Sequence, residues 1–362
     1  KIQIETVICD KMRRQRVVFP VCQEILKSNK FVLLLVLALI QNSFPHVRAN
    51  TDESRPGGLS IGEKISEIGF YQSIDIQSAD PIYKSRSDYQ DITVFESKHY
   101  GKILVLDGVL QLTEVDAASY NEMMVHIPMM DHISGAKNVL VIGGGDGYVL
   151  SEVLKYDSVE RVDHVDLDRE VIEVCKKYFS WGRAWDDKRV SLHVSDGAAF
   201  VKDSPDGFYD VVIQDSSDPF TWNDEGEIVP LPSGSLYTKE HITHIKRILS
   251  VNGVFNFQAE TFQIPSDING IVEWRRNALD IGFETVKYGT LYISSYPTGQ
   301  IGFLLCRKNE NESSNADVIR ERYNQMISNG HVTKYYHPDL HNASFVLPLW
   351  VTETIYGDSC TK

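Results

Sequence analysis

The sequence is poor in cysteine, in basic residues and in long apolar runs. Its 362 residues contain five cysteines, whose spacing suits neither a metal site nor a paired disulfide framework, so reduced thiols are expected. Lysine and arginine number 36 against 50 aspartates and glutamates, which gives a formal net charge of -14. Without a basic stripe to neutralise phosphates, the chain is not expected to bind nucleic acid. An acidic chain is compatible with a cationic substrate, although an acidic surface more often serves only solubility.

The longest apolar run covers residues 31–40 and is too short to span a bilayer. Its length suits the core of a signal peptide, and residues 47–49 (Val-Arg-Ala) resemble a cleavage site. A buried helix or a misplaced gene start is the open alternative. We therefore treat residues 1–58 as an N-terminal extension that can carry a targeting signal, and we expect no stable membrane span.

Residues 59–115 alternate apolar and polar side chains with the period of a β-strand. Turns separate the β-rich runs, and Asp107-Gly108 is a strong hairpin signal. The β-rich runs lie at 89–96, 102–106 and 109–113. The sequence therefore predicts a small antiparallel β domain.

A larger domain is predicted at residues 116–350, followed by a C-terminal tail at 351–362. It begins with a helix at 116–132, with Asp116 as a plausible N-cap and a methionine-rich side that we interpret as core packing. Strand and helix patterns then alternate, which specifies a parallel, doubly wound α/β sheet. The predicted strands lie at 138–142, 161–166, 190–195, 208–214, 253–258, 285–292 and 301–306. The predicted helices lie at 147–156, 168–179, 196–203 and 238–249.

A glycine-rich turn follows the first predicted strand of this sheet. Glycines let the backbone turn sharply and leave no Cβ between the chain and a ligand. A dinucleotide fingerprint needs its third glycine or alanine at the position of Tyr148. The glycines instead stand at Gly143, Gly145 and Gly147, around Asp146, a spacing similar to the adenosylmethionine-binding loop of the methyltransferase-like fold. A purely structural strand-to-helix turn is the alternative.

Carboxylates stand at the predicted strand ends, where open α/β sheets bind ligands. Four of them are in register: Asp146, Asp166, Asp196 and Asp215. Asp166 is placed to hold the two hydroxyls of a ribose. Asp215 and Asp218 follow a buried strand, and such a pair beside a nucleoside can bind an ammonium group and accept its proton. Carboxylates can also hold a metal, but catalytic metal sites usually recruit histidine as well, so no metal is expected. A capped turn before Pro219 is the remaining alternative.

Ordered motifs over residues 61–350 resemble the spermidine synthase family. They are Ser87–Asp91 (SDYQD), Leu106–Glu114 (LDGVLQLTE), Ser119-Tyr120, Gly143–Gly147 (GGGDG), Asp215–Pro219 (DSSDP), Tyr296–Phe303 (YPTGQIGF) and Phe345–Pro348 (FVLP). The resemblance implies transfer of an aminopropyl group from decarboxylated S-adenosylmethionine to putrescine, which gives spermidine and methylthioadenosine. The sulfonium is already an activated leaving group, so this reaction needs alignment and a neutral amine. Decarboxylated S-adenosylmethionine would be a co-substrate, with no tightly bound cofactor.

The resemblance also implies roles for individual residues. Asp215 would be the catalytic proton acceptor. The putrescine-binding residues would be Tyr120, Asp215, Asp218, Gln258 and Tyr296. The donor-binding residues would be Gln90, Asn121, Gly143, Gly145, Asp146, Gly147, Asp166, Asp196 and Gly197. Among these, Asp166 would hold the ribose and Asp196 with Gly197 the adenine side, while Asp146 and Gln90 would hold the aminopropyl arm.

The chain departs from the family pattern at four places. Asp166 stands where glutamate is usual, Asn121 where glutamine or histidine is common, and Tyr148 replaces a glycine of the loop. The segment 220–234 is longer than the usual Gly-Pro-Ala-Glu turn by about ten residues, a length that a surface loop tolerates cheaply. Its acids would either hold a longer polyamine or belong to a solvated insertion.

Three other functions stay open beside spermidine synthesis. They are putrescine N-methylation, a spermine-type synthase acting on spermidine, and a non-catalytic paralogue that binds nucleoside or polyamine. Retention of Asp215, Asp218, Tyr120 and Tyr296 together argues against the paralogue. We also expect a homodimer, because the small β domain is too thin to cover its own apolar faces and the family associates through it. The resemblance implies a cytoplasmic enzyme, although residues 31–40 leave a secreted or targeted form open.

Overall fold

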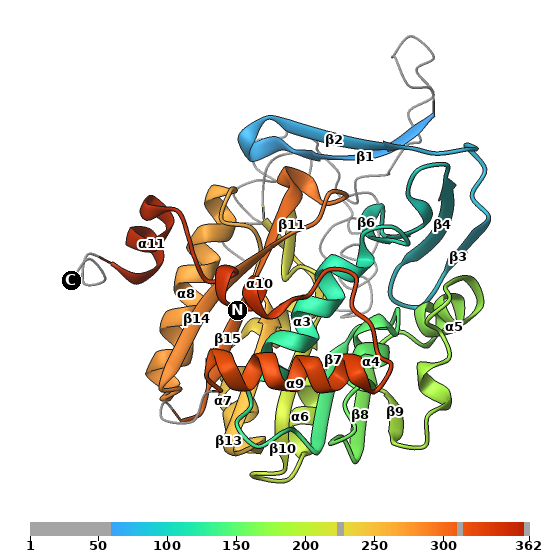
Figure 1. The fold of residues 1–362 in the computed structure, drawn as a ribbon. Coiled ribbons are helices and arrows are strands. Elements are labelled where there is room, and N and C mark those ends of the chain that lie inside the picture. The colour runs from blue at the N-terminus through green and yellow to red at the C-terminus, as the bar shows by residue number, and fades with distance from the viewer. Residues whose placement is uncertain (1–58, 223–227, 310–313, 358–362) are drawn as a thin grey trace, which may run out of the picture. The chain divides into compact units, whose positions relative to one another are not determined.

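The computed structural model describes residues 59–222, 228–309 and 314–357. The part of the chain with alternating β and α patterns forms a seven-stranded sheet, and the part before it forms two small antiparallel sheets (Figure 1). The extension 1–58, with its apolar run, lies outside the described residues. Among the helices of the described ranges, none is both long and apolar enough to cross a membrane.

The large sheet has the strand order β14-β15-β13-β10-β7-β8-β9. The strands are β7 (Asn138–Gly143), β8 (Arg161–Asp166), β9 (Val190–Val194), β10 (Tyr209–Asp215), β13 (Leu249–Gln258), β14 (Thr285–Tyr292) and β15 (Gln300–Arg307). Five neighbours from β13 to β9 are parallel, whereas β15 is antiparallel to both β13 and β14. A short connection, residues 293–299, joins β14 to β15, so these two strands pair as a hairpin. The predicted methyltransferase-like α/β sheet is confirmed, with this hairpin added at one edge.

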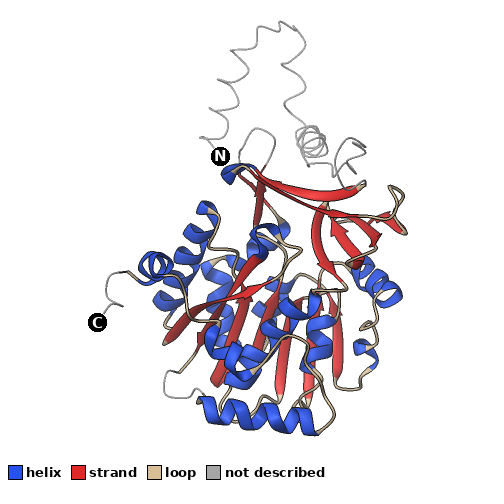
Figure 2. Cartoon of the chain, turned by 45° about the horizontal axis from the view of Figure 1, so that its top comes forward, coloured by secondary structure: helices blue, strands red, loops and turns tan. Residues whose placement is uncertain are grey.

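Helices cover both faces of the large sheet (Figure 2). One face carries α3 (Ala117–Asp131), α4 (Tyr148–Val153) and α9 (Ala316–Ser328), and the other carries α6 (Gly197–Asp203), α7 (Lys239–Ile248), α8 (Pro265–Ile281) and α11 (Leu349–Tyr356). Along β7, Val139 and Val141 pack on the first face while Leu140 and Ile142 pack on the second. Burial on both faces explains why the strands are continuous apolar runs. Every residue of α3 is buried, which confirms its methionines as core packing.

Two small sheets precede α3. They consist of β1 (Ser60–Ile65) with β2 (Phe70–Asp75), and of β3 (Tyr83–Arg86), β4 (Asp91–Ser97), β5 (Gly101–Leu106) and β6 (Val109–Thr113). Asp107 and Gly108 have φ of 47° and 86°, as the predicted two-residue hairpin turn requires. Helix α5 (Arg169–Tyr178) of the large domain packs on the four-stranded sheet through Val171, Val174 and Cys175. The small β domain therefore shares a hydrophobic core with the large one.

Two of the five cysteines, Cys175 and Cys306, lie in the described part of the chain and are buried free thiols. Burial raises the pKa of both thiols well above the usual range. A buried, protonated thiol is a poor nucleophile, which agrees with their prediction as reduced, unpaired side chains.

The sequence missed helix α8, and helix α11 crosses the predicted boundary between the large domain and the C-terminal tail. Helix α8 begins with Pro265 in its first turn and ends at Gly282, whose φ is 95°; both are ordinary boundary signals. Helix α11 continues past residue 350 to Tyr356, because Val351 and Ile355 are buried in the core below it.

The insertion at 220–234 contains a short hairpin stem. Strands β11 (Phe220–Trp222) and β12 (Ile228–Pro230) pair antiparallel. A 3-10 helix, η4 (Pro232–Tyr237), then leads into α7. The acids of the insertion, Asp224, Glu225 and Glu227, which would either hold a longer polyamine or belong to a solvated loop, lie outside the described residues.

Candidate active site

Strands β10, β7 and β8 are neighbours in the sheet and end at its predicted ligand edge. The Gly144 amide donates to the Asp215 carbonyl at 2.7 Å, which ties the glycine loop after β7 to the end of β10. Gly143 has φ of 75°, and a Cβ there would lie 2.0 Å from the Asp215 carbonyl oxygen. Any other residue at position 143 would push these two strand ends apart. The loop and Asp215 are therefore parts of one rigid surface.

Asp166 and Asp146 lie at this edge with their carboxyls turned toward backbone amides. Asp166 accepts from the Asp168 amide at 2.8 Å and also from the Gly145 amide. Asp146 accepts from the Tyr148 amide at 2.8 Å. Burial, joined by the charge of Asp215, raises the pKa of Asp146 to about 8 and that of Asp166 to about 7. Three of the four predicted strand-end acids therefore face a common space.

Gln90 reaches this space from the small β domain. Its amide nitrogen donates to Asp168 Oδ2 at 2.9 Å, and Ser87 Oγ donates to the same oxygen at 2.6 Å. The other oxygen of Asp168 caps helix α5 by accepting from the Glu170 amide at 3.0 Å. Because the Gln90 nitrogen is occupied, its carbonyl oxygen is the part left to meet a ligand. Asp168 thus joins the two domains at the donor edge.

The remaining predicted donor residues lie around the same edge with less specific contacts. Asp196 is exposed and caps α6 through the Ala199 amide at 2.8 Å, and Gly197 is the first residue of that helix. Asn121 is buried on α3, where its amide nitrogen donates to the Ala117 carbonyl at 2.8 Å. Its Oδ1 has no hydrogen-bond partner among the described residues.

Asp215 lies between the glycine loop and a pair of tyrosines. The Tyr120 hydroxyl donates to Asp215 Oδ1 at 2.8 Å. Burial raises the pKa of Asp215 to about 6, although this hydrogen bond lowers it. The Tyr296 ring lies 6.2 Å from that of Tyr120, and its hydroxyl donates to the Gln111 carbonyl at 2.5 Å. A carboxylate in this setting is ionised at neutral pH and available as a proton acceptor.

Asp116 fixes the segment that carries Tyr296. Its position before α3 is that of an N-cap, but no hydrogen bond from the helix reaches its side chain. The carboxylate instead accepts from the Ser295 amide at 2.8 Å and from the hydroxyls of Ser294 and Thr113 at 2.9 and 2.6 Å. Asp116 therefore occupies the predicted N-cap position, but its carboxylate is satisfied by these donors and not by amides of the helix.

Beyond Asp215 lies a group of acids that we call the outer acid set. It consists of Glu63, Asp218, Glu260 and Asp267. Gln258 links the set to the sheet, since its amide nitrogen donates to Asp218 Oδ1 at 3.4 Å while Tyr237 donates to its oxygen at 2.5 Å. Among the described residues, no ion pair joins any member of the set to lysine, arginine or histidine.

Burial and mutual repulsion raise the pKa values of these acids. Burial, followed by the charge of Asp218, raises the pKa values of Glu63 and Asp267 to about 7. The pKa of Glu260 is raised well above its usual range by burial and by the charges of Asp218 and Asp267. Glu260 Oε1 is buried without a hydrogen-bond partner among the described residues. Acids in this state gain most from a cation that enters between them.

The chain matches known proteins over most of its length. Residues 117–316 match the model of the spermine/spermidine synthase domain, and residues 63–114 match that of the spermidine synthase tetramerisation domain. Spermidine synthase 2 of Arabidopsis thaliana is 39% identical over 280 residues, which cover 76% of this chain and 78% of the relative. Spermidine synthase 2 of Datura stramonium is 40% identical over 279 residues, 76% of this chain and 83% of the relative. The chain belongs to the spermidine synthase family. It is therefore an aminopropyltransferase.

A solved member of the spermidine synthase family shows the same fold. A crystal structure of spermidine synthase in complex with the transition state analogue AdoDATO superposes with a TM-score of 0.72 at 30% identity. The superposition covers 82% of this chain and 94% of that one. The division between the two family models, between residues 114 and 117, falls beside the domain boundary predicted at 115/116.

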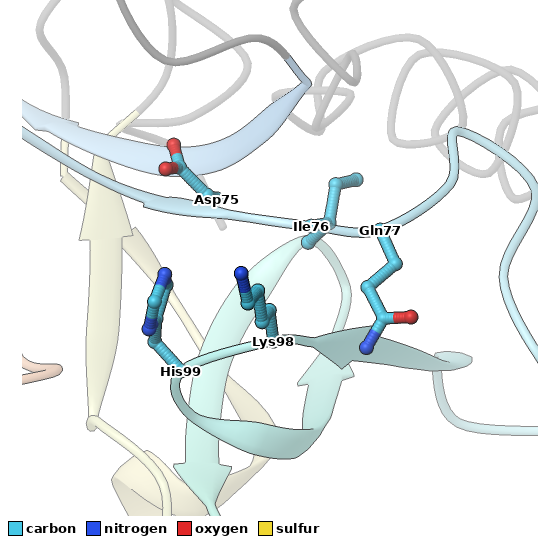
Figure 3. A pocket seen from close by; sticks show the side chains of 5 residues that line it. All are labelled: Asp75, Ile76, Gln77, Lys98 and His99. Carbon is cyan, nitrogen blue, oxygen red and sulfur yellow. The ribbon is translucent and has the colours of Figure 1, made fainter.

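A separate cavity of about 440 Å³ lies in the small β domain of this family member. Its lining residues are Asp75, Ile76, Gln77, Lys98 and His99 (Figure 3). Acidic and basic side chains line it together, and none of the residues assigned to donor or amine by sequence takes part. We therefore assign it no role in aminopropyl transfer.

The sequence missed Asp168 and three members of the outer acid set. Asp168 could have been found as the N-cap of the predicted helix 168–179. Glu63, Glu260 and Asp267 come from β1, the end of β13 and the start of α8, and no sequence spacing connects them. Only folding brings them together.

Proposed function

We propose that this chain transfers the aminopropyl group of decarboxylated S-adenosylmethionine to putrescine. The carrying observation is that Asp215 holds the glycine loop through its backbone carbonyl and lies three residues before Asp218, a member of the outer acid set. A lone pair on the amine nitrogen of putrescine would form a bond to the carbon next to the sulfonium. The carbon–sulfur bond would break with its electrons going to sulfur, and the proton of the amine would pass to Asp215.

The donor would occupy the loop side of this edge as a co-substrate, without a tightly bound cofactor. Asp166 would accept from the ribose hydroxyls, and Asp196 with Gly197 would border the adenine. Asp146 and the free carbonyl oxygen of Gln90 would hold the ammonium of the aminopropyl arm. The solved relative was crystallised with the transition state analogue AdoDATO, which supports a donor of this kind as a ligand of the shared fold.

The amine would occupy the side lined by Tyr120 and Tyr296. One nitrogen would lie at Asp215, where burial makes the carboxylate a better proton acceptor than a free aspartate. The other nitrogen would remain an ammonium at Asp218 and Gln258. The hydrogen bond from Tyr120 orients the Asp215 carboxylate, so that its second oxygen is free for the proton.

A longer amine is a second candidate acceptor, and the outer acid set favours it. Together with Asp215 the set supplies more carboxylates than a diamine, with a charge of about +2, can compensate. A triamine brings one further positive charge. Spermidine as acceptor, which would give spermine, is therefore the alternative within the same chemistry.

A product assay separates these possibilities. The purified chain is incubated with either putrescine or spermidine and with either decarboxylated or ordinary S-adenosylmethionine, and products are identified by mass. Spermidine and methylthioadenosine from the first amine with the decarboxylated donor are the expected result. Formation of N-methylputrescine from the ordinary donor, or no turnover with either donor, would refute the proposal.

We further propose that the chain forms a homodimer or larger oligomer through residues 63–114. The match to a tetramerisation domain supports association of this region. Strand β2 and the turn before it expose Ile68, Phe70 and Tyr71, apolar side chains that a partner copy would cover. Sedimentation equilibrium at micromolar concentration is expected to show an oligomer, and a monomer would refute the proposal.

A further inference from the structure

Two tryptophans hold the glycine loop from outside the ligand edge. Trp181 donates its indole N–H to the Asp146 carbonyl at 2.8 Å. Trp185 donates its indole N–H to His164 Nδ1 at 2.8 Å, and His164 Nε2 lies 2.7 Å from the Gly143 carbonyl oxygen. Both chains of hydrogen bonds end on carbonyls of the loop.

The protonation of His164 follows from its neighbours. An indole N–H can only donate, so Nδ1 must accept and Nε2 must carry the hydrogen that goes to the Gly143 carbonyl. His164 is completely buried, and burial lowers its pKa to about 4. The ring is therefore neutral at physiological pH and held in one tautomer, which keeps the relay from Trp185 to the loop intact.

Packing reinforces both tryptophan contacts. The ring of Trp181 stacks on Tyr148, with centroids 4.6 Å apart and planes 19° apart. Tyr148, the residue that replaces a glycine of the family loop, is the first residue of α4, so the stack ties Trp181 to the end of the loop. A Cβ on Gly147, whose φ is 82°, would lie 2.4 Å from the Trp185 ring, so this ring presses directly on the loop.

We propose that Trp181 and Trp185, the latter through His164, are positioning residues for the nucleoside donor. Neither tryptophan is among the residues predicted to contact the donor. Both instead fix the loop that carries Asp146 and the Gly145 amide, which donates to Asp166. A flexible loop would lose backbone entropy when the donor binds. Holding the loop in its binding conformation beforehand removes that cost and raises donor affinity. The inference rests on the proposed function, because it concerns the same donor site.

The test uses the double variant Trp181→Phe/Trp185→Phe, which keeps both aromatic rings and removes both N–H donors. Calorimetry with methylthioadenosine is expected to show about 5- to 30-fold weaker binding, the scale of two lost hydrogen bonds. The KM for decarboxylated S-adenosylmethionine should rise in parallel, whereas kcat and the KM for putrescine should stay within about twofold. Trp350→Phe, a half-exposed tryptophan on α11, is the matched control and should change nothing.

Donor binding within twofold of the wild type in the folded double variant would overturn the proposal. Equal increases in the KM values of donor and amine would also overturn it, because they would indicate general destabilisation. Hydrogen exchange of the wild-type protein gives an independent readout if the variant does not fold. The amides of Gly144 and Gly147, which donate to backbone carbonyls, should be protected before any ligand is added. Protection that arises only with methylthioadenosine would overturn preorganisation.

Wild-type measurements separate this inference from the proposed function. A wild-type chain that binds methylthioadenosine and makes spermidine, with an unaffected double variant, would remove only the positioning role. A wild-type chain that binds no methylthioadenosine would overturn both.

Discussion

The donor side and the amine side of the active site use carboxylates in opposite ways. On the donor side, each carboxylate already has protein donors: Asp146 has the Tyr148 amide, and Asp168 has a hydroxyl, a side-chain amide and a backbone amide. On the amine side, the outer acid set is crowded by like charges and has no ion pair among the described residues.

This difference matches the two kinds of substrate. A ribose presents neutral hydroxyls, which are recognised by acceptors held in fixed directions. A polyamine is a flexible polycation, which is recognised by charge more than by direction. Asp215 belongs to both sides, because its backbone carbonyl holds the glycine loop and its side chain faces Tyr120. Breaking one side should therefore leave binding on the other side largely intact.

The largest expected effect is at Asp215, the residue that belongs to both sides of the active site. Asp215→Asn keeps the size of the side chain and its hydrogen bond with Tyr120 but removes the proton acceptor. We expect kcat to fall by about 100-fold or more, the scale of lost general-base catalysis, while methylthioadenosine binding changes little. Steady-state kinetics with putrescine, supported by calorimetry, provide the measurement. Asp280→Asn, in the exposed pair of Asp280 with Lys239, is the control. Turnover within a few-fold of the wild type would remove Asp215 as the base.

Donor-side residues were the easier part to predict from sequence, because they follow the strand pattern. Each strand end could be located from its apolar run: Asp166 and Asp215 are the last residues of β8 and β10, and Asp146 lies in the glycine loop that follows β7. Parallel strands bring their carboxyl ends to one edge, so sequence order alone placed these acids together. The predicted helices at 147–156, 168–179 and 196–203 also agree with α4, α5 and α6 to within a few residues.

Amine-side residues were harder to predict from sequence, because their positions depend on contacts between distant segments. The hairpin of β1 and β2 brings Glu63 to the site, and it is held there by Gln72, which donates to the Ser294 carbonyl at 2.7 Å. Glu67 in the same hairpin accepts from Ser266 Oγ at 2.7 Å, just before Asp267. Residues separated by about two hundred positions meet here, and no local pattern encodes such a pairing.

A donor-side substitution should weaken binding of the nucleoside without changing binding of the amine. Asp166→Ala removes the carboxylate proposed to hold the ribose. We expect methylthioadenosine affinity to fall by about 1–3 kcal/mol, the range for a hydrogen bond to a charged group, with the KM for putrescine unchanged. Calorimetry with methylthioadenosine and with NAD tests this, and NAD should bind the wild type more weakly than methylthioadenosine does. Unchanged methylthioadenosine affinity, or tighter NAD binding, would contradict the assignment.

The acids of both sides should make the ligand-free protein less stable as pH rises. A carboxyl whose pKa is higher in the folded state stabilises the fold at low pH, and this contribution is lost progressively as pH rises from the unfolded value, about 4, through the folded value. Asp146, Asp166, Glu63 and Asp267, with pKa values of about 7 to 8, therefore predict a Tm that still falls from about pH 6.5 and levels off at about pH 8.

Three buried histidines oppose this decline only at the lower end of the window. The pKa values of His164, His241 and His341 are lowered by burial to about 4, so their contribution to stability rises with pH and becomes constant above about pH 7.5. Thermal unfolding of the free protein should show the decline, and Asp267→Asn should reduce it while Asp280→Asn should not. Added spermidine should raise Tm more at the upper pH. A Tm that rises across the window would contradict the assigned shifts.

The smallest expected effect concerns how Gln90 is oriented by Asp168. In the wild type, Asp168 accepts from the Gln90 amide nitrogen at 2.9 Å, so the Gln90 oxygen is free for the ammonium of the aminopropyl arm. Asp168→Asn places a donor against that nitrogen, which favours a flipped Gln90 that presents its own donors to the ammonium. The KM for decarboxylated S-adenosylmethionine should then rise about three- to tenfold, the scale of about one net hydrogen bond.

Methylthioadenosine lacks the aminopropyl arm, so its affinity should not change in Asp168→Asn. Ser87→Ala is a comparison variant: it removes the second donor to the same Asp168 oxygen, at 2.6 Å, and the acceptor of the Gln90 backbone amide, at 3.1 Å, but keeps the bond from the Gln90 side chain to Asp168. Equal weakening of methylthioadenosine and of the decarboxylated donor would show that Asp168 supports the whole donor side through helix α5. Weakening of the decarboxylated donor alone would show that one carboxylate sets which end of Gln90 faces the charged arm, so the preorganised side also recognises a cation by direction.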